Sequence, residues 1–151
     1  MDTRTRGDVT MVRTVGDLAL RAAGRFPDKA AVLQGTGAMT FSEVFEQSTR
    51  LGAFLREIGV GKGDRVCFFL EKRFEKVVSI FGTALAGGVF VPIRRLSKNA
   101  QAAHILNDSG AGVLITTANR VPAIVAAHKD LKGLRTVISI GTVGDIAVPD
   151  G

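Results

Sequence analysis

The sequence predicts an α/β fold in which a parallel sheet is covered by helices on both faces. Between Arg65 and Thr117, strand-like and helix-like segments alternate, which indicates parallel strands joined by crossover helices. Residues 66–70 (Val-Cys-Phe-Phe-Leu) are continuously apolar, as in a strand covered on both faces. Residues 84–92 (Ala-Leu-Ala-Gly-Gly-Val-Phe-Val-Pro) end a helix on two glycines, begin a buried strand and close it with proline.

The N-terminal part predicts a flexible arm over residues 1–13, then a helix and a short β-hairpin. Thr14 is an expected N-cap, with Asp17 three residues on, and Pro27 stops the helix. Residues 30–33 and 39–41 are the expected hairpin strands, with a turn at 35–37. The apolar stripe of the helix consists of Val15, Leu18, Ala19, Ala22 and Phe26.

A second helix is expected to begin with Ser42 as its N-cap and to end at Gly59. Its expected buried face consists of Val44, Phe45, Leu51, Phe54, Leu55 and Ile58. The remaining expected elements alternate along the chain: strand 65–70, helix 74–85, strand 89–91, helix 98–107, strand 113–115, helix 121–128 and strand 136–140. We therefore expect one α/β subdomain over residues 14–141, followed by a frayed tail over 142–151.

Composition narrows the class of protein. The 151 residues are 46% hydrophobic and 23% charged, with a net charge of +6. The cations are scattered, so we favour a solvated surface over nucleic-acid binding. Residues 77–93 carry no charge, but Gly82, Gly87, Gly88 and Pro92 interrupt them, so no membrane span is expected. The N-terminus has no signal-peptide core, and the single Cys67 suits a reducing compartment, so we expect a cytoplasmic protein.

Several kinds of site are not predicted. His104 and His128 lie too far apart to share a metal, and His104 is expected to be half-buried and structural. Cys67 is expected to be a small buried hydrophobe in its strand. The glycine-rich loop 59–64 follows a helix and opens a strand, which is the reverse of a phosphate loop. The sequence therefore predicts no catalytic residue and no metal site.

Basic residues follow two of the predicted strands. Arg94, Arg95 and Lys98 come between strand 89–91 and the next helix, and Arg120 follows strand 113–115. In open parallel sheets ligands bind at the carboxyl ends of strands, and a helix N-terminus with nearby cations suits a phosphate. The alternative is an exposed basic loop with no ligand.

The order of these pieces resembles the start of the AMP-forming acyl-CoA synthetases and fatty acyl-AMP ligases, the adenylate-forming superfamily. The resemblance covers roughly residues 14–141. Five stretches carry it together: residues 26–32 (FPDKAAV), 39–44 (MTFSEV), 55–66 (LREIGVGKGDRV), 84–92 (ALAGGVFVP) and 104–115 (HILNDSGAGVLI).

The resemblance implies the N-terminal subdomain of an enzyme that joins a carboxylic acid, such as a fatty acid, to AMP with ATP and Mg²⁺. A thiol, of CoA or of a carrier protein, then takes the acyl group. The family's phosphate loop, its adenine- and ribose-binding motifs and its catalytic lysine are absent from these residues. We therefore expect a fragment that is inactive alone and binds no cofactor by itself.

Two stretches depart from the family pattern. Arg94 and Arg95 stand where relatives commonly have Asn-Pro or Asp-Pro, and residues 71–75 (Glu-Lys-Arg-Phe-Glu) replace a usual proline and small polar residue. The first departure makes Arg94, Arg95 and Arg120 candidate contacts for the phosphates of CoA. The second puts the shape of that loop in doubt.

The partner of such a fragment is expected to be the remainder of the ligase, or a second copy bound through an exposed apolar face. The alternative function is a stand-alone α/β interaction module, since a fold does not fix a function. Nucleic-acid binding through the positive charge is the third hypothesis and the least favoured.

Overall fold

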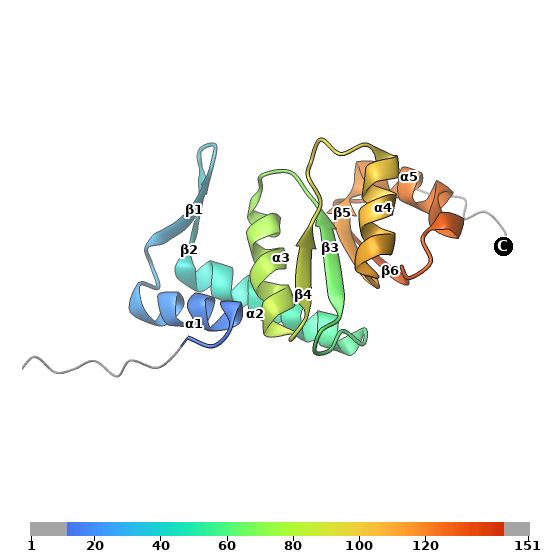
Figure 1. Cartoon of the computed structure of the whole chain (residues 1–151). Helices are drawn as coiled ribbons and strands as arrows, with labels where there is room; N and C mark the ends of the chain where they lie inside the picture. The colour runs from blue at the N-terminus through green and yellow to red at the C-terminus, as the bar shows by residue number, and fades with distance from the viewer. Residues whose placement is uncertain (1–11, 144–151) are drawn as a thin grey trace, which may run out of the picture.

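The chain forms a four-stranded parallel sheet between two layers of helices, with a two-stranded hairpin beside it (Figure 1). This computed structural model describes residues 12–143. The predicted arm 1–13 and tail 142–151 therefore lie almost entirely outside the described residues, and their boundaries remain predictions.

The elements follow the predicted order with small shifts at their ends. The helices are α1 (Val15–Arg25), α2 (Phe41–Glu57), α3 (Phe74–Leu85), α4 (Asn99–Ser109) and α5 (Val121–Ala126), with two 3₁₀ turns, η1 (Ala118–Arg120) and η2 (His128–Asp130). The strands are β1 (Ala30–Gln34), β2 (Gly37–Thr40), β3 (Arg65–Phe69), β4 (Val89–Pro92), β5 (Val113–Thr117) and β6 (Thr136–Ile140).

The strand order in the large sheet is β4-β3-β5-β6, and every pairing is parallel. The side chains of β3 alternate between the two faces. Cys67 and Phe69 pack with α4 and α5, whereas Val66 and Phe68 pack with α2 and the end of α3. This confirms the predicted coverage of both faces and explains why residues 66–70 show no polar alternation.

A third cluster joins the hairpin to the helices. Met39 of β2, Val44 of α2 and Val78 of α3 are buried together there. Helix α3 therefore packs on its inner side against α2 and the hairpin.

The N-cap of α2 is Thr40, so the prediction of Ser42 was wrong. The Thr40 Oγ1 accepts the Glu43 N–H at 3.2 Å, and the Glu43 carboxylate accepts the Thr40 N–H at 2.7 Å. The reciprocal pair of a capping box begins the helix two residues earlier than predicted, and β2 ends at Thr40. The predicted cap at Thr14 is confirmed by the same reciprocal arrangement with Asp17.

Two burial predictions were also wrong. Phe54 was expected on the buried face of α2, yet it is 44% exposed, because the buried contacts of the helix centre on Val44, Ser48, Gly52 and Leu55. Strand β4 was expected to be buried, but it is the edge of the sheet and Val89 is 49% exposed.

The edge strand β4 offers few hydrogen-bonding groups to a neighbour. The Val89 N–H donates to the Asp64 carbonyl at 2.7 Å and the Ile93 N–H donates to the Phe68 carbonyl at 2.9 Å. Alternate residues of a strand point their backbone amides to the same side. The backbone nitrogens of Phe90 and Pro92 therefore point away from β3, toward the open edge. Proline has no N–H, and proline is tolerated in edge strands for that reason.

Candidate functional site

The carboxyl ends of β4, β3 and β5 lie together at one end of the sheet, because the three strands run parallel. The segment 93–98 leaves β4, residues 70–73 leave β3, and η1 leaves β5. Both basic positions that the sequence singled out therefore lie at this end.

The segment Arg94–Lys98 is a tight, anchored loop. Ile93 before it is fully buried and is bonded to the end of β3. The Ser97 N–H donates to the Arg94 carbonyl at 2.9 Å, and the Lys98 N–H donates to Gln101 Oε1 at 3.0 Å as α4 begins. Arg94 and Arg95 are exposed, and no hydrogen bond or ion pair of their side chains to another described residue is found.

Arg120 is held beside this loop. Its Nη2 donates to the Arg95 carbonyl oxygen at 3.1 Å. The Cζ of the same guanidinium lies 3.9 Å from the centroid of the Phe69 ring, within the range of a cation–π contact. The structure thus brings Arg120 against the backbone of Arg95.

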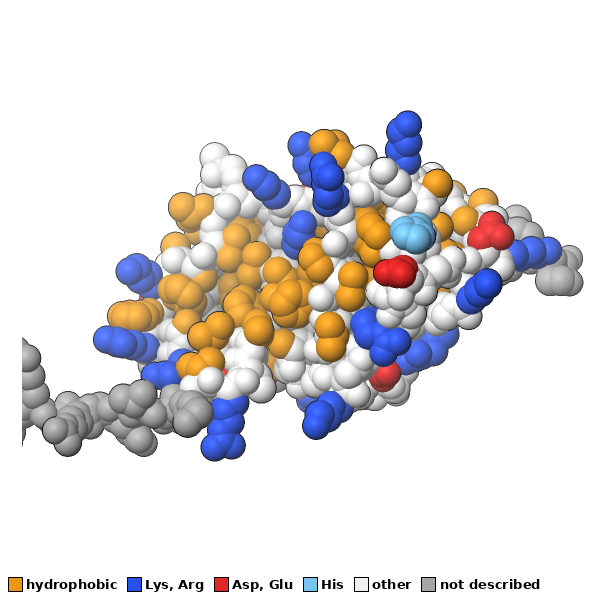
Figure 2. All heavy atoms as spheres, viewed as in Figure 1, with side chains coloured by type: hydrophobic (Ala, Val, Ile, Leu, Met, Phe, Trp, Pro, Cys, Tyr) orange, Lys and Arg blue, Asp and Glu red, His pale blue; other side chains and the backbone are white. Residues whose placement is uncertain are grey.

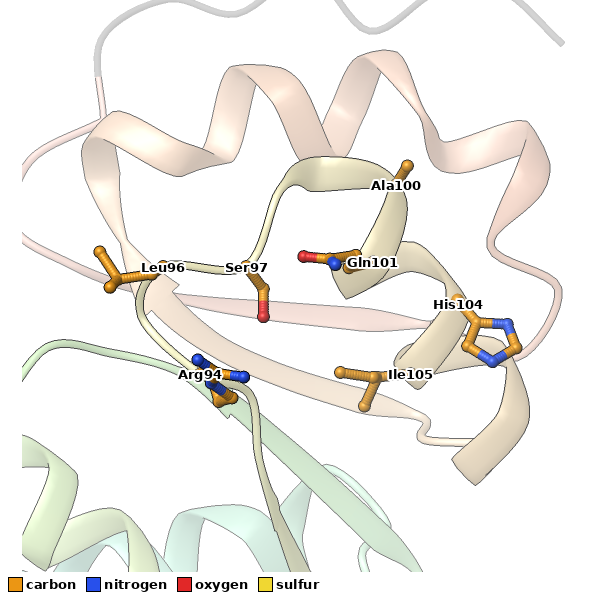
Figure 3. A pocket seen from close by; sticks show the side chains of 7 residues that line it. All are labelled: Arg94, Leu96, Ser97, Ala100, Gln101, His104 and Ile105. Carbon is orange, nitrogen blue, oxygen red and sulfur yellow. The ribbon is translucent and has the colours of Figure 1, made fainter.

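A shallow open hollow of about 690 Å³ adjoins the loop, on the side of α4. Figure 3 shows the Arg94, Ser97, Gln101 and Ile105 side chains facing one another across it, with His104 at its far end. Its lining residues are Arg94, Leu96, Ser97, Ala100, Gln101, His104 and Ile105. The prediction that His104 is half-buried was wrong, because its ring lies on the exposed side of α4.

Arg94 was predicted from the sequence as a site residue, but the walls of this hollow on α4 were not. Gln101 and Ile105 are four residues apart on α4, so they share one side of the helix. That spacing was visible in the sequence, but it could not show which side faces the Arg94 loop.

The loop after β3, where relatives usually have a proline and a small polar residue, carries a bidentate ion pair. The Arg73 Nε and Nη2 donate to the two carboxylate oxygens of Glu75 at 2.7 and 2.8 Å. The hydrogen bonds from Arg73 hold the pKa of Glu75 below its usual range. This pair shapes the first turn of α3 and leaves Glu75 committed to a partner.

Cys67 and the glycine loop have structural roles. Cys67 is fully buried and its Sγ lies 3.6 Å from Ser109 Oγ. Burial raises the pKa of the Cys67 thiol, which is the reverse of what a nucleophile needs. In the loop 59–64, Gly59 and Gly63 adopt positive φ, and the Gly61 N–H donates to Asp64 Oδ2 at 2.8 Å.

Within residues 12–143, no group of three or more His, Cys, Asp or Glu side chains could hold a metal ion. Over the same residues, no helix has both the length and the apolar character needed to cross a membrane.

The chain is similar to known proteins over most of its length. The family model described as AMP-binding enzyme matches residues 20–148. The chain is 33% identical over 104 residues to the long-chain-fatty-acid–CoA ligase of Bacillus subtilis, which covers 69% of this chain and 19% of that protein. It is 31% identical over 112 residues to bacitracin synthase 1 of Bacillus licheniformis, covering 74% of this chain and 2% of that protein.

The fold agrees with the sequence comparison. The solved structure of a Mycobacterium tuberculosis fatty acyl CoA synthetase superposes with a TM-score of 0.78 at 26% identity, over 84% of this chain and 26% of that one. The chain thus spans about a fifth or less of these two curated relatives. The match over residues 20–148 and the shared fold show that this chain belongs to the AMP-binding enzyme family. Its fold is that of the N-terminal α/β subdomain of the adenylate-forming ligases.

Proposed function

We propose that this chain is the N-terminal part of an AMP-forming acyl-CoA synthetase or acyl-AMP ligase. The whole enzyme would join a carboxylic acid to AMP and release pyrophosphate, and would then pass the acyl group to the thiol of CoA or of a carrier protein. ATP and Mg²⁺ belong to that complete enzyme. We place this chemistry in the cytoplasm, which suits the free Cys67 thiol.

One observation supports this proposal above the others. The parallel sheet β4-β3-β5-β6, with its helices and hairpin, superposes on a solved fatty acyl CoA synthetase. The superposition covers 84% of this chain but 26% of that protein. A fold alone would not fix a function, but here fold and sequence similarity point to the same enzymes.

We infer that the chain is catalytically inactive by itself. Adenylation develops negative charge around the α-phosphate, and a catalyst must supply aimed donors or a metal there. The described residues hold no group of three or more His, Cys, Asp or Glu side chains that could bind a metal ion, and their turn at residues 35–36 joins the two hairpin strands in place of a phosphate loop. The residues present do not fit the Mg²⁺–ATP complex, so we assign no catalytic residue.

We further propose that Arg94 and Arg95 contact the phosphates at the nucleotide end of CoA in the complete enzyme, with Arg120, the third basic candidate, beside them. Support comes from their place at the carboxyl ends of the strands and from the unpaired guanidinium groups of Arg94 and Arg95 among the described residues. A guanidinium presents a planar fork of donors that matches a phosphate. The open hollow next to Arg94 leaves room for the ligand.

The apolar outer side of the molecule supports a partner. Figure 2 shows hydrophobic side chains gathered over the hairpin, α3 and β4. Val77, Ile80 and Ala84 follow one side of α3, between Leu33 of the hairpin (75% exposed) and Val89 of β4 (49% exposed). We propose that the remainder of the ligase covers this surface. The same surface also favours the second candidate function, an interaction module that binds a copy of itself.

Two measurements test the proposed function. In an ATP–pyrophosphate exchange assay with a panel of fatty acids and amino acids, we expect the purified chain to be inactive; exchange by the chain alone would overturn the inference of inactivity. Sequencing the DNA downstream of codon 151 should reveal a Ser/Thr/Gly-rich phosphate loop, in frame or frameshifted.

Sedimentation separates the two candidate functions. A concentration-dependent dimer that dissociates when Val89→Asp is introduced would favour the interaction module. A monomer at high concentration, with a ligase sequence downstream, would favour the fragment.

A further inference from the structure

One guanidinium joins the ends of three neighbouring strands. Arg120 follows β5, its ring partner Phe69 is the last residue of β3, and its hydrogen-bond acceptor Arg95 lies on the loop that leaves β4. Phe69 is 1% exposed, so the surface against which the guanidinium stacks is part of the rigid core. The loop that carries Arg94 and Arg95 is therefore tied to the core by a side chain from η1, the turn that follows β5.

The chemistry of this contact requires arginine. A guanidinium can place its flat face on an aromatic ring while the N–H groups in its plane bond sideways to a carbonyl. A lysine ammonium carries the same charge, but it cannot stack as a plane and direct a donor sideways at once. The contact thus depends on the shape of the group as well as on its charge.

We propose that Arg120 is a positioning residue that holds the Arg95 carbonyl and so fixes the loop 94–98, the Arg94 wall of the hollow, before a ligand arrives. In this role Arg120 acts on the ligand through the loop, whereas Arg94 and Arg95 present their free side chains to it. We call the two contacts of Arg120, with the Phe69 ring and with the Arg95 carbonyl, the clamp. The identity of the ligand rests on the proposed function, whereas the clamp rests on these two contacts alone.

This role differs from direct phosphate binding. The Cζ of the Arg120 guanidinium lies over the Phe69 ring and its Nη2 is already engaged by the Arg95 carbonyl. The remaining donors are fewer than those of Arg94 or Arg95, whose side chains carry no bond to a described residue. A loop that is already ordered before the ligand arrives would lose less conformational entropy when the ligand binds.

Limited trypsin digestion of the full chain tests the clamp, because Arg94 and Arg95 are themselves cleavage sites. We expect Arg120→Lys to be cut after these two residues on the order of fivefold faster than the wild type, the factor of one lost hydrogen bond. Arg50→Lys is the matched control, since the Arg50 side chain pairs with Glu46 on the exposed surface of α2, away from the loop. Equal loop cleavage in Arg120→Lys and the wild type, with equal melting temperatures, would overturn the clamp.

A second variant guards against a folding defect. Phe69→Leu keeps an apolar side chain but removes the ring, and we expect it to raise amide hydrogen exchange at residues 94–98 while strand β5 stays protected. Combining it with Arg120→Lys should add little further exchange. Additive effects of the two substitutions on the loop would contradict the shared contact.

Titration with adenosine 3′,5′-bisphosphate, followed by NMR, separates this inference from the proposed function. A positioning role predicts that Arg120→Lys weakens binding severalfold although the charge is kept; retention of affinity would indicate direct charge contact and overturn it. If the wild type binds no bisphosphate but its loop still depends on Arg120, the clamp stands and the proposed CoA contact is lost.

Discussion

The two ends of the sheet are built differently. At the amino end, the Gly63 N–H donates to the Gly87 carbonyl at 3.1 Å, and Arg65 Nε donates to the Ser109 carbonyl at 2.7 Å. Glycines with positive φ, among them Gly63 and Gly87, allow these turns to close. At the carboxyl end, Arg94, Arg95 and Leu96 project into solvent, and the side chain of Arg120 ties their loop to the end of the neighbouring strands.

This difference suggests that the two ends of the sheet have different roles, one in stability and the other in ligand binding. Loops whose backbone groups are satisfied by their neighbours contribute to stability, whereas loops that leave cationic side chains unpaired are suited to a ligand. We therefore expect substitutions at the amino end to change unfolding free energy, and substitutions at the carboxyl end to change binding.

The largest expected effect is at Gly88, where β4 begins at the amino end. A Cβ there would lie 3.1 Å from the Asp64 carbonyl oxygen, 3.1 Å from Thr83 Cγ2 and 3.3 Å from Val60 Cγ1. Because the carbonyl belongs to a paired backbone, we expect Gly88→Val to lower the free energy of unfolding by about 1–3 kcal/mol in urea denaturation. Leu96→Ser, at a position 70% exposed at the other end, is the control and should stay within about 0.5 kcal/mol of the wild type. Similar losses in both variants would remove the contrast between the ends.

The next effect concerns the carboxyl end. We expect Arg94→Ala combined with Arg95→Ala to weaken binding of adenosine 3′,5′-bisphosphate about tenfold, since charge-assisted bonds to phosphate would be lost. Calorimetric titration measures the affinity. The pair Arg13→Ala and Arg50→Ala removes the same charge elsewhere and should leave binding nearly unchanged. An equal decrease in both pairs would mean that net charge, and no local site, attracts the anion.

Asp64 tests the hydrogen bonds of the amino-end turn. Asp64→Ala removes the acceptor of the Gly61 N–H, and we expect the free energy of unfolding to fall by about 1 kcal/mol. Asp64→Asn keeps an oxygen that can accept the same bond and should recover most of the loss. If the Asp64→Ala and Asp64→Asn variants unfold at the same urea concentration as the wild type, this hydrogen bond does not stabilise the turn.

The smallest effect is a pH dependence at the Arg73–Glu75 pair. The hydrogen bonds from Arg73 lower the pKa of Glu75 in the folded chain from its ordinary value of 4.5. The stabilisation is therefore fully present above that value and is lost as the pH falls through the folded pKa. Because both side chains are partly exposed to solvent (30% and 40%), we expect only a few tenths of a kcal/mol. The wild type should lose this increment in melting experiments below about pH 4.5, whereas Glu75→Gln should not. Parallel pH curves for the two proteins would contradict it.

The fold was predictable because its signals are local and repeated. The apolar run 66–70, the glycines at 87–88 and the alternation of elements each indicate a parallel sheet, and the structure confirms it. The errors arose where two local signals competed. Thr40 and Ser42 are both good N-caps, but only Thr40 has Glu43 three residues on, so the capping box selects it.

Burial and the site depended on packing between distant elements. Phe54 and Leu55 are adjacent and both apolar, yet only the arrangement of α2 on the sheet decides that Leu55 is buried and Phe54 is exposed. Similarly, the basic residues at 94, 95 and 120 were visible in the sequence, but the contact of Arg120 with Phe69 spans 51 positions and follows from strand order. Periodicity along one element carries no information about such a pair.

The burial of Cys67 gives this chain an internal reporter. Alkylating reagents attack thiolates, and a sulfur without solvent access and with a raised pKa reacts only when its strand separates from the surrounding helices. Since Cys67 is the sole cysteine, the rate of iodoacetamide labelling would read out the opening of the central strand without any engineered probe. The docking of a partner on the apolar surface over α3 could then be followed by how far it slows that reaction.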